Sequence, residues 1–220
     1  TGQAPKIAGV ITRTIDRRCT MRRHIAAGVL AALCVGLAVG VVNVQVASAQ
    51  PLTSAVTGVA DEQSDAIVNA AAARLDVMPD VAYTKYRLNL PVEDLVREKQ
   101  AEDAFVASAT ARGIDAQVAR NVIRDQMVAS KMVQYELISK WKVTPPPVRP
   151  YKDLAKELRP VIDAETARLT SGLADAVATG IPADWRTQVQ RSADSAARSL
   201  DVAVSRAALD RSLVSIAALS

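Results

Sequence analysis

The sequence has almost none of the residues on which nucleophilic and metal-dependent catalysis usually rely. Its 220 residues include one histidine, His24, and two cysteines, Cys19 and Cys34, and all three precede residue 50. The residues that follow therefore have no Ser–His–Asp triad, no cysteine nucleophile and no thiolate or imidazole ligand for a metal. Catalysis in that part of the chain must use arginine, lysine, carboxylate, amide and hydroxyl groups.

Residues 21–49 have the pattern of a secretory signal peptide. Basic residues follow Met21, an apolar segment covers residues 25–46, and Ala47-Ser48-Ala49 forms an A-x-A cleavage site. We expect translation to begin at Met21 and cleavage to follow Ala49. A membrane anchor is the alternative interpretation, because the apolar segment approaches the length of a spanning helix.

Cleavage there would divide the chain into an N-terminal extension with a signal peptide, residues 1–49, and a single domain, residues 50–220. We expect that domain to be secreted or periplasmic and, after signal removal, free of the membrane. Six of the 27 Lys and Arg residues and one of the 23 Asp and Glu residues precede residue 50, which leaves 21 and 22. This near-neutral balance gives no support for nucleic-acid binding. The domain must also be stable without disulfides.

Apolar residues in the domain recur at helical spacing and rarely alternate, so we expect an all-α bundle of about five to six helices. Pro79 should end or kink the first helix, with Asp80 capping a short continuation to residue 86. Gly113 should end the second helix and Asp115 should cap the third. The helices are predicted at residues 53–77, 92–112, 116–142 and 152–179, with one or two more after Pro182 and a stiff proline-rich connector at 144–150.

Three pairs of polar residues are spaced so that each pair shares a helix face: Arg74 with Lys85, Asp94 with Arg97, and Ser130 with Gln134. At i,i+3 spacing a carboxylate can pair with a guanidinium and orient it. The Ser130–Gln134 pair places a hydroxyl and an amide beside apolar residues. Each pair taken alone is common on the solvated face of a helix, so only the three pairs together, in their order and spacing, indicate a function.

In its order and spacing the series resembles the secreted, all-helical chorismate mutases, the gamma subclass of the AroQ-type family. The resemblance is carried by the motifs Ala73-Arg74-Leu75-Asp76-Val77, Lys85-Tyr86-Arg87, Leu90-Pro91-Val92-Glu93-Asp94-Leu95-Val96-Arg97-Glu98, Ile123-Arg124-Asp125-Gln126 and Trp141-Lys142. It is close over residues 66–142 and looser beyond them. It implies the type II (helical) chorismate mutase fold.

The resemblance also implies a function, the rearrangement of chorismate to prephenate in aromatic amino acid biosynthesis. This isomerase reaction is intramolecular and pericyclic, so it uses no nucleophile, metal or cofactor, in keeping with the residue inventory. Enzymes of this kind are usually homodimers with each site formed within one chain. Chorismate and a second copy of the chain are therefore the expected partners.

Roles for individual residues follow from the resemblance as well. Arg74 and Arg159 would bind the two substrate carboxylates, and Lys85 would bridge a carboxylate and the ether oxygen. Gln134 would donate its amide N–H to the same oxygen. Arg97, oriented by Asp94, would complete the cationic wall. Glu98 would meet the ring hydroxyl, and Ser130 would donate to a carboxylate.

The assignment of Arg159 has competitors in Arg149 and Arg168, because Pro160 disfavours helical geometry at the residue before it. Some secreted members have glutamate at the position of Gln134, which must be protonated to donate. An amide donates at any pH, so we expect activity that does not fall between pH 5 and 8.

Two other functions are open. A non-catalytic helical envelope protein would bind a partner through an exposed apolar stripe in the last 35 residues, which contain Leu200, Val202, Val204, Ala207, Leu209 and Leu213. A relative that binds chorismate without rearranging it, or a lyase-like enzyme on the same fold, would keep the bundle. Lys85 and Gln134 argue against the second alternative, since both would serve the ether oxygen.

Overall fold

The computed structural model describes residues 52–201 and 203–220, so the predicted extension, signal peptide and cleavage site lie outside the described residues. The described residues form helices and the turns between them. The helices are α1 (Leu52–Asp76), α2 (Met78–Leu88), α3 (Leu95–Thr110), α4 (Ala116–Val143), the π-helical turn η1 (Leu154–Leu158), α5 (Arg159–Thr179), α6 (Trp185–Ala196) and α7 (Arg206–Ser212). The all-α prediction is confirmed. One predicted helix, at residues 152–179, is divided into η1 and α5.

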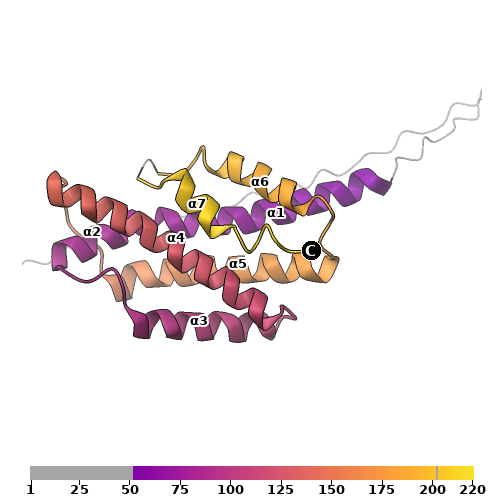
Figure 1. Ribbon diagram of the computed structural model, residues 1–220, viewed down its shortest axis with the longest axis horizontal. Helices are drawn as coiled ribbons and strands as arrows, with labels where there is room; N and C mark the ends of the chain where they lie inside the picture. The colour runs from indigo at the N-terminus through magenta and orange to yellow at the C-terminus, as the bar shows by residue number, and fades with distance from the viewer. Residues whose placement is uncertain (1–51, 202) are drawn as a thin grey trace, which may run out of the picture. The chain divides into compact units, whose positions relative to one another are not determined.

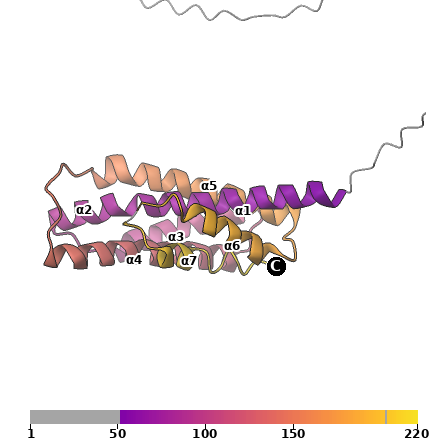
Figure 2. The ribbon, with the colours of Figure 1, turned by 90° about the horizontal axis from the view of Figure 1, so that it is seen from above.

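Two long helices, α1 and α5, lie side by side and run antiparallel in both ribbon views (Figures 1 and 2). The second long helix pair is α3 and α4, and α4 also packs on α2 and α7. Helix α6 covers α1 on the side away from α3. The last helices are therefore part of the bundle.

The α1–α5 pair is close because of a glycine. A Cβ atom on Gly172 would lie 2.8 Å from Cγ1 of Ile67, whose side chain is fully buried. Around this contact the core takes large side chains from every part of the described chain, including Leu75, Ile123, Leu169, Leu173, Trp185, Leu209 and Ile216. The indole N–H of Trp185 donates to the carbonyl of Ile216 at 2.8 Å, which holds the last residues against α6.

Most of the large apolar residues described in the C-terminal segment belong to this core, although Ala207 and Val214 are exposed. Val204, Leu209 and Leu213 are at most 6% exposed. The exposed docking stripe required by the envelope-protein alternative is therefore not formed by these residues, and that alternative has no support.

The predicted helix ends are right at some positions and wrong at others. The Asp115 carboxylate caps α4, since it accepts from the backbone N–H groups of Gln117 at 2.8 Å and Val118 at 3.0 Å. Gly113 follows the end of α3 with a φ of +86°, a conformation that glycine adopts without strain. Asp80 does not cap α2. It lies inside the first turn of α2, and its carboxylate is bonded to Lys152 at 2.6 Å.

Asp80 instead holds the proline-rich connector onto α2, because it also pairs with Arg149 at 3.0 Å. The Tyr83 hydroxyl accepts from the Arg149 N–H at 2.7 Å and donates to the Arg149 carbonyl at 2.8 Å. Thr84 donates to the carbonyl of Lys152 at 3.0 Å. These contacts bring the start of α5 back to α2.

The conformation predicted before Pro160 is wrong. Arg159 has helical φ and ψ of −59° and −44°, and α5 begins at this residue directly after η1. Pro160 lies at the start of α5, where the fixed φ of proline suits a helix. The π-helical turn, capped by Asp153, supplies the helical geometry on the N-terminal side.

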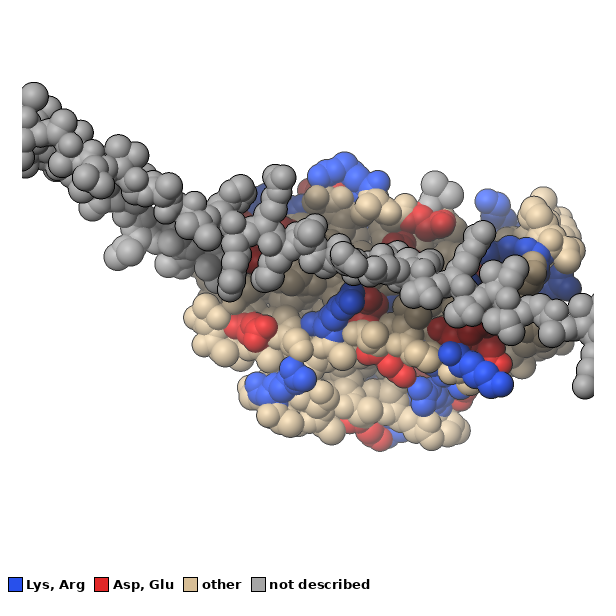
Figure 3. Space-filling model, turned by 180° about the vertical axis from the view of Figure 1, so that it is seen from behind, with Lys and Arg blue, Asp and Glu red and all other residues tan. Residues whose placement is uncertain are grey.

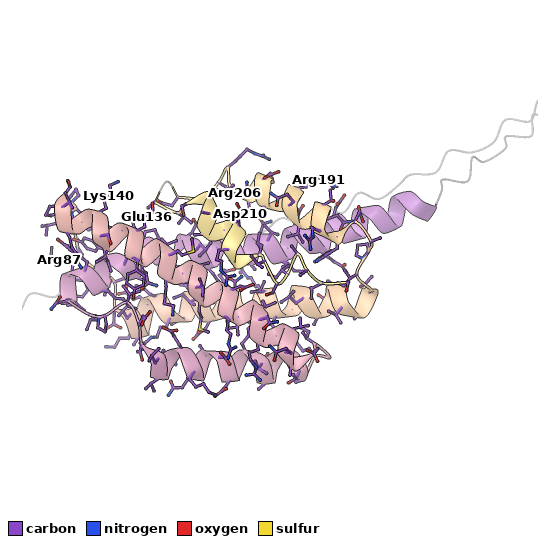
Figure 4. The ribbon with its side chains drawn as sticks, in the orientation of Figure 1. Arg87, Glu136, Lys140, Arg191, Arg206 and Asp210 are labelled. Carbon is purple, nitrogen blue, oxygen red and sulfur yellow. The ribbon has the colours of Figure 1, made fainter. Side chains whose placement is uncertain are left out.

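Charged side chains of both signs are distributed over the described surface. Lys and Arg side chains are interspersed with Asp and Glu on the face in Figure 3. Figure 4 shows Arg206 and Asp210 together on α7, where they form an ion pair of 2.8 Å, and Arg191 on α6. None of the helices formed by the described residues has both the length and the hydrophobicity needed to cross a membrane.

Candidate active site

A pocket of about 420 Å³ opens where five parts of the chain meet. Its walls come from the end of α1, from α2, from the loop at residues 89–94 with the start of α3, from the middle of α4, and from η1 with the start of α5. All eight residues singled out from the sequence line it: Arg74, Lys85, Asp94, Arg97, Glu98, Ser130, Gln134 and Arg159.

Arg74 and Lys85 face the pocket together because the helical direction continues through Val77. This residue separates α1 from α2 but keeps helical φ and ψ of −79° and −22°. The three-turn spacing is therefore preserved. Arg74 lies in the last turn of α1 and Lys85 in the last turn of α2.

Arg74 is an unusual cation, since its side chain is buried without an anionic partner. The residue is 5% exposed. Its acceptors in the described part of the chain are uncharged: Gln126 Oε1 at 3.3 Å, the Thr166 hydroxyl and the Ile162 carbonyl at 3.5 Å. Burial lowers the pKa of Arg74 to about 10, while nearby Asp163 and Glu165 act in the opposite direction. The guanidinium is thus charged at neutral pH, and an anion in the pocket would balance it.

The α2–α3 loop holds the Lys85 side chain in place. Its Nζ donates to the carbonyl of Val92 at 2.6 Å. Burial lowers the pKa of Lys85, the carboxylates of Asp94 and Glu98 raise it, and Arg159 lowers it further. Arg159, from the start of α5, lines the same pocket as Lys85 from α2.

Ser130 and Gln134 place polar groups in the wall formed by α4, and both are at most 8% exposed. The Ser130 hydroxyl donates to the Gln126 carbonyl at 2.8 Å. The Gln134 Nε2 donates to the Ser130 carbonyl at 3.1 Å and to the Met78 sulfur at 3.6 Å. Because a thioether is a weak acceptor, one N–H of Gln134 is available to a stronger one. The Oε1 of Gln134 has no hydrogen-bond partner among the described residues.

The predicted orientation of the Arg97 guanidinium by Asp94 is wrong. The Asp94 carboxylate accepts from the backbone N–H of Arg97 at 3.0 Å and so caps α3, which begins at Leu95 rather than at Val92. Glu98 completes a reciprocal cap, since its Oε1 accepts from the Asp94 N–H at 3.4 Å. The i,i+3 spacing is the same for a cap and for an ion pair, so spacing alone did not distinguish them.

Arg159, Arg149 and Arg168 were the candidates for the second arginine that binds a substrate carboxylate. Of these three, only Arg159 lines the pocket. Arg149 pairs with Asp80, with its guanidinium 4.5 Å from the centre of the Tyr83 ring. Arg168 is paired with Glu165 at 3.0 Å and lines a different hollow, between α1 and α5.

The pocket also contains residues that the sequence reasoning missed. Lys131 forms an ion pair of 2.9 Å with Glu98, and Met78, Met127 and Asp163 complete the wall. Lys131 directly follows Ser130 in the sequence, and this adjacency was the feature that could have indicated its place at the pocket. Five cations therefore border the pocket against four carboxylates, those of Glu93, Asp94, Glu98 and Asp163. The described residues contain no group of three or more His, Cys, Asp or Glu side chains suited to holding a metal ion.

Comparison with known proteins assigns this chain and its fold to a family. The family model for chorismate mutase type II matches residues 59–135. A solved chorismate mutase from Burkholderia phymatum is 34% identical, and the match covers 97% of that chain and 70% of this one, with a TM-score of 0.64. The chain belongs to the type II chorismate mutase family. The all-helical bundle and the resemblance noted in the sequence are thereby confirmed.

Relatives in this family include exported proteins. A secreted chorismate mutase from Mycobacterium tuberculosis is 33% identical over 105 residues, which are 48% of this chain and 53% of the relative. A secreted chorismate mutase from Mycolicibacterium smegmatis is 34% identical over 79 residues, 36% of this chain and 44% of the relative. The chain thus matches about half the length of these curated relatives. Their names agree with the prediction of an exported protein.

Proposed function

We propose that this protein is an exported chorismate mutase that converts chorismate to prephenate. One observation carries the proposal. A single pocket gathers Arg74, Lys85, Arg97 and Arg159, from four different elements, around the amide of Gln134. Chorismate is a dianion whose ether oxygen gains negative charge as its bond breaks, and such a pocket provides cations for the carboxylates and an N–H donor for the oxygen.

Arg74 and Arg159, which both line the pocket, would bind the two carboxylates. Arg74 is suited to this because its buried guanidinium donates to neutral acceptors only, so it could still form a direct ion pair with a substrate carboxylate. Lys85 would bridge a carboxylate and the ether oxygen. Its bond to the Val92 carbonyl uses one of three N–H donors and leaves two for the substrate.

Gln134 would donate to the ether oxygen with the N–H that now contacts the Met78 sulfur. Ser130 would donate to a carboxylate after its hydroxyl rotates away from the Gln126 carbonyl. Arg97 would extend the cationic wall, and Glu98 would accept from the ring hydroxyl while it remains paired with Lys131. Asp94 would act through the α3 cap and through its negative charge beside Lys85.

The mechanism needs only binding and electrostatics. A pericyclic rearrangement has no leaving group and no obligatory proton transfer, so the pocket acts by holding the side chain over the ring in a reactive conformation. Fixed N–H donors then stabilise the charge that develops on the ether oxygen. No cofactor is required in this scheme.

A direct assay tests the proposal. The ultraviolet absorbance of chorismate should disappear on mixing with the protein, and the isolated product should give phenylpyruvate when acidified. No loss of absorbance at micromolar protein would contradict the proposal.

Substitution then tests the site. Lys85→Ala and Arg74→Ala should each lower kcat/KM by about 10²-fold or more, as expected when a transition-state donor is removed. Lys140→Ala is a matched control, because Lys140 is exposed near the end of α4 (Figure 4) and does not line the pocket. Equal effects at Lys85 and Lys140 would exclude the assigned site.

We further propose a homodimer with one complete site in each chain, located outside the cytoplasm. All eight proposed site residues line one pocket within a single chain, and this supports one complete site in each chain. Sedimentation equilibrium of the purified protein measures the assembly, and a monomer at micromolar concentration would contradict the dimer.

A further inference from the structure

Arg74 owes its position to a buried glutamine that no assigned role uses. Gln126 is fully buried on α4. Its Oε1 accepts from the Nε–H of Arg74 at 3.3 Å, and its Nε2 donates to the backbone carbonyl of Ser212, in α7, at 2.8 Å. One amide therefore connects the pocket arginine with a helix that contributes no residue to the pocket.

These two partners determine which way the amide points. A guanidinium only donates and a backbone carbonyl only accepts. The opposite orientation would place an NH₂ group against the Nε–H and an oxygen against the carbonyl. Gln126 therefore presents a fixed acceptor to Arg74, and the C-terminal segment holds that acceptor in place.

The fixed acceptor also selects the edge of the guanidinium that faces the substrate. Gln126 uses the Nε–H of Arg74, and the Thr166 hydroxyl and the Ile162 carbonyl use Nη1. Nη2 makes no hydrogen bond to any described residue, so it is the nitrogen left for an anion. Because all three acceptors are neutral, they orient the guanidinium without cancelling its charge.

We propose that Gln126 is a positioning residue, which orients Arg74 toward one substrate carboxylate and couples this orientation to α7. The proposal rests on the proposed function, because the carboxylate is that of chorismate. Loss of the amide should leave the charge of Arg74 in the pocket but allow the guanidinium to rotate. Substrate binding should therefore suffer more than the chemical step.

The first test is Gln126→Leu in the full chain, which keeps the approximate volume and removes both hydrogen bonds. KM for chorismate should rise about tenfold, with kcat lowered by less than about threefold, the pattern of a lost contact made equally in ground and transition states. Gln188→Leu is the matched control. Gln188 is an equally buried glutamine, it donates to Asp184 at 2.9 Å on α6, and its loss should leave KM unchanged. An unchanged KM in folded Gln126→Leu would overturn the proposal.

The second test asks whether Gln126 acts through Arg74. Lysine at position 74 keeps the charge but lacks the Nε–H, so Gln126→Leu should raise KM no further in an Arg74→Lys background. The same tenfold rise in both backgrounds would assign Gln126 a general structural role and overturn the proposal. If Gln126→Leu does not fold, Thr166→Val removes another neutral acceptor and should raise KM in the same way, and an unchanged KM there would count against the proposal.

A measurement without substrate separates this proposal from the proposed function. In ¹⁵N NMR spectra the Arg74 Nε–H should exchange slowly with water in the wild type and in Gln188→Leu, and rapidly in Gln126→Leu. Slow exchange in Gln126→Leu would overturn the positioning role even if the enzyme turns over chorismate. Absence of turnover in the wild type would overturn the proposed function, whereas the NMR signal would still report on Gln126.

Discussion

At the scale of single residues, the pocket holds cations that have different surroundings. Arg74 is charged among neutral acceptors, whereas Lys85 lies near the carboxylates of Asp94 and Glu98. Arg74, with a pKa of about 10, stays protonated throughout the physiological range. Activity should therefore fall at alkaline pH when either cation loses its proton. The pH at which Lys85 does so can be shifted by changing its charged neighbours. The donor proposed for the ether oxygen, Gln134, is an amide and has no titration of its own.

Gln134→Glu should make the activity depend on pH. A glutamate must be protonated to donate, and its ordinary pKa is about 4.3, so kcat/KM of the variant should fall steeply as pH rises from 5 to 8. The wild-type profile should not fall across the same window. Chorismate consumption measured at several pH values gives both profiles. A wild-type rate that drops as steeply as that of the variant would exclude Gln134 as the donor.

Asp94→Asn should move the alkaline limit of kcat/KM to lower pH. The Asp94 carboxylate raises the pKa of Lys85, so its removal should lower that pKa further below the ordinary lysine value of 10.5, and Lys85 should lose its proton at a lower pH. Asparagine caps a helix as well as aspartate does, so thermal stability should change little. Asp103→Asn removes the same charge from an exposed position on α3, and it should leave the profile in place. A shift of equal size in both variants would contradict the assignment.

At the scale of the helices, the pocket depends on where each helix begins and how closely α1 and α5 pack. Asp94 and Asp115 begin α3 and α4 by accepting backbone N–H groups. The contact of Gly172 with Ile67 lets α5 lie close to α1, so that the start of α5 reaches the end of α1. The resulting arrangement brings Arg159 to the same pocket as Arg74.

Gly172→Ala should destabilise the fold, although alanine is the better helix former. The new methyl group would lie 2.8 Å from Ile67 Cγ1, and the cost of overpacking, about 1–3 kcal/mol, exceeds the helix-propensity gain of about 1 kcal/mol. Urea unfolding measures the change. Ile67→Ala should cost less in the Gly172→Ala background than in the wild type, because the added methyl group fills part of the cavity. Additive losses would show that the two side chains do not compete for this space.

At the scale of the whole described unit, the C-terminal segment is bonded to the middle of α4. The buried Asp125 carboxylate accepts from Arg211, from the Ser215 N–H at 2.9 Å and from the Ser215 hydroxyl at 2.6 Å. Gln126, the next residue, is bonded to Ser212. Two adjacent residues of α4 therefore hold α7 and the last turns in place.

Asp125→Ala should lower the free energy of unfolding by about 3 kcal/mol, because it leaves three buried or half-buried donors without their acceptor. Amide hydrogen exchange should become faster over α7 and the residues after it. Asp210→Ala is the control, since it breaks only the exposed pair with Arg206 and should cost less than about 1 kcal/mol. Equal losses in the two variants would show that the Asp125 contacts do not hold the C-terminal segment.

The sequence alone determined the features that are local in the chain. Helical periodicity, Gly113 and Asp115 predict the helices. The spacing predicts that Arg74 shares a helix face with Lys85 and that Ser130 shares one with Gln134, since both follow from the pitch of a helix. Spacing does not distinguish a cap from an ion pair, because the i,i+3 pair of Asp94 and Arg97 suits a side-chain ion pair as well as a bond to the backbone.

Only the tertiary structure decided what depends on contacts between distant segments. It placed Arg159 rather than Arg149 or Arg168 at the pocket, because the connector is bonded to α2 and α5 packs on α1. It also joined Gln126 to Ser212, 86 residues further along the chain. Periodicity describes one helix at a time, whereas these contacts depend on how helices pack together, and that packing determines which charges meet in the pocket.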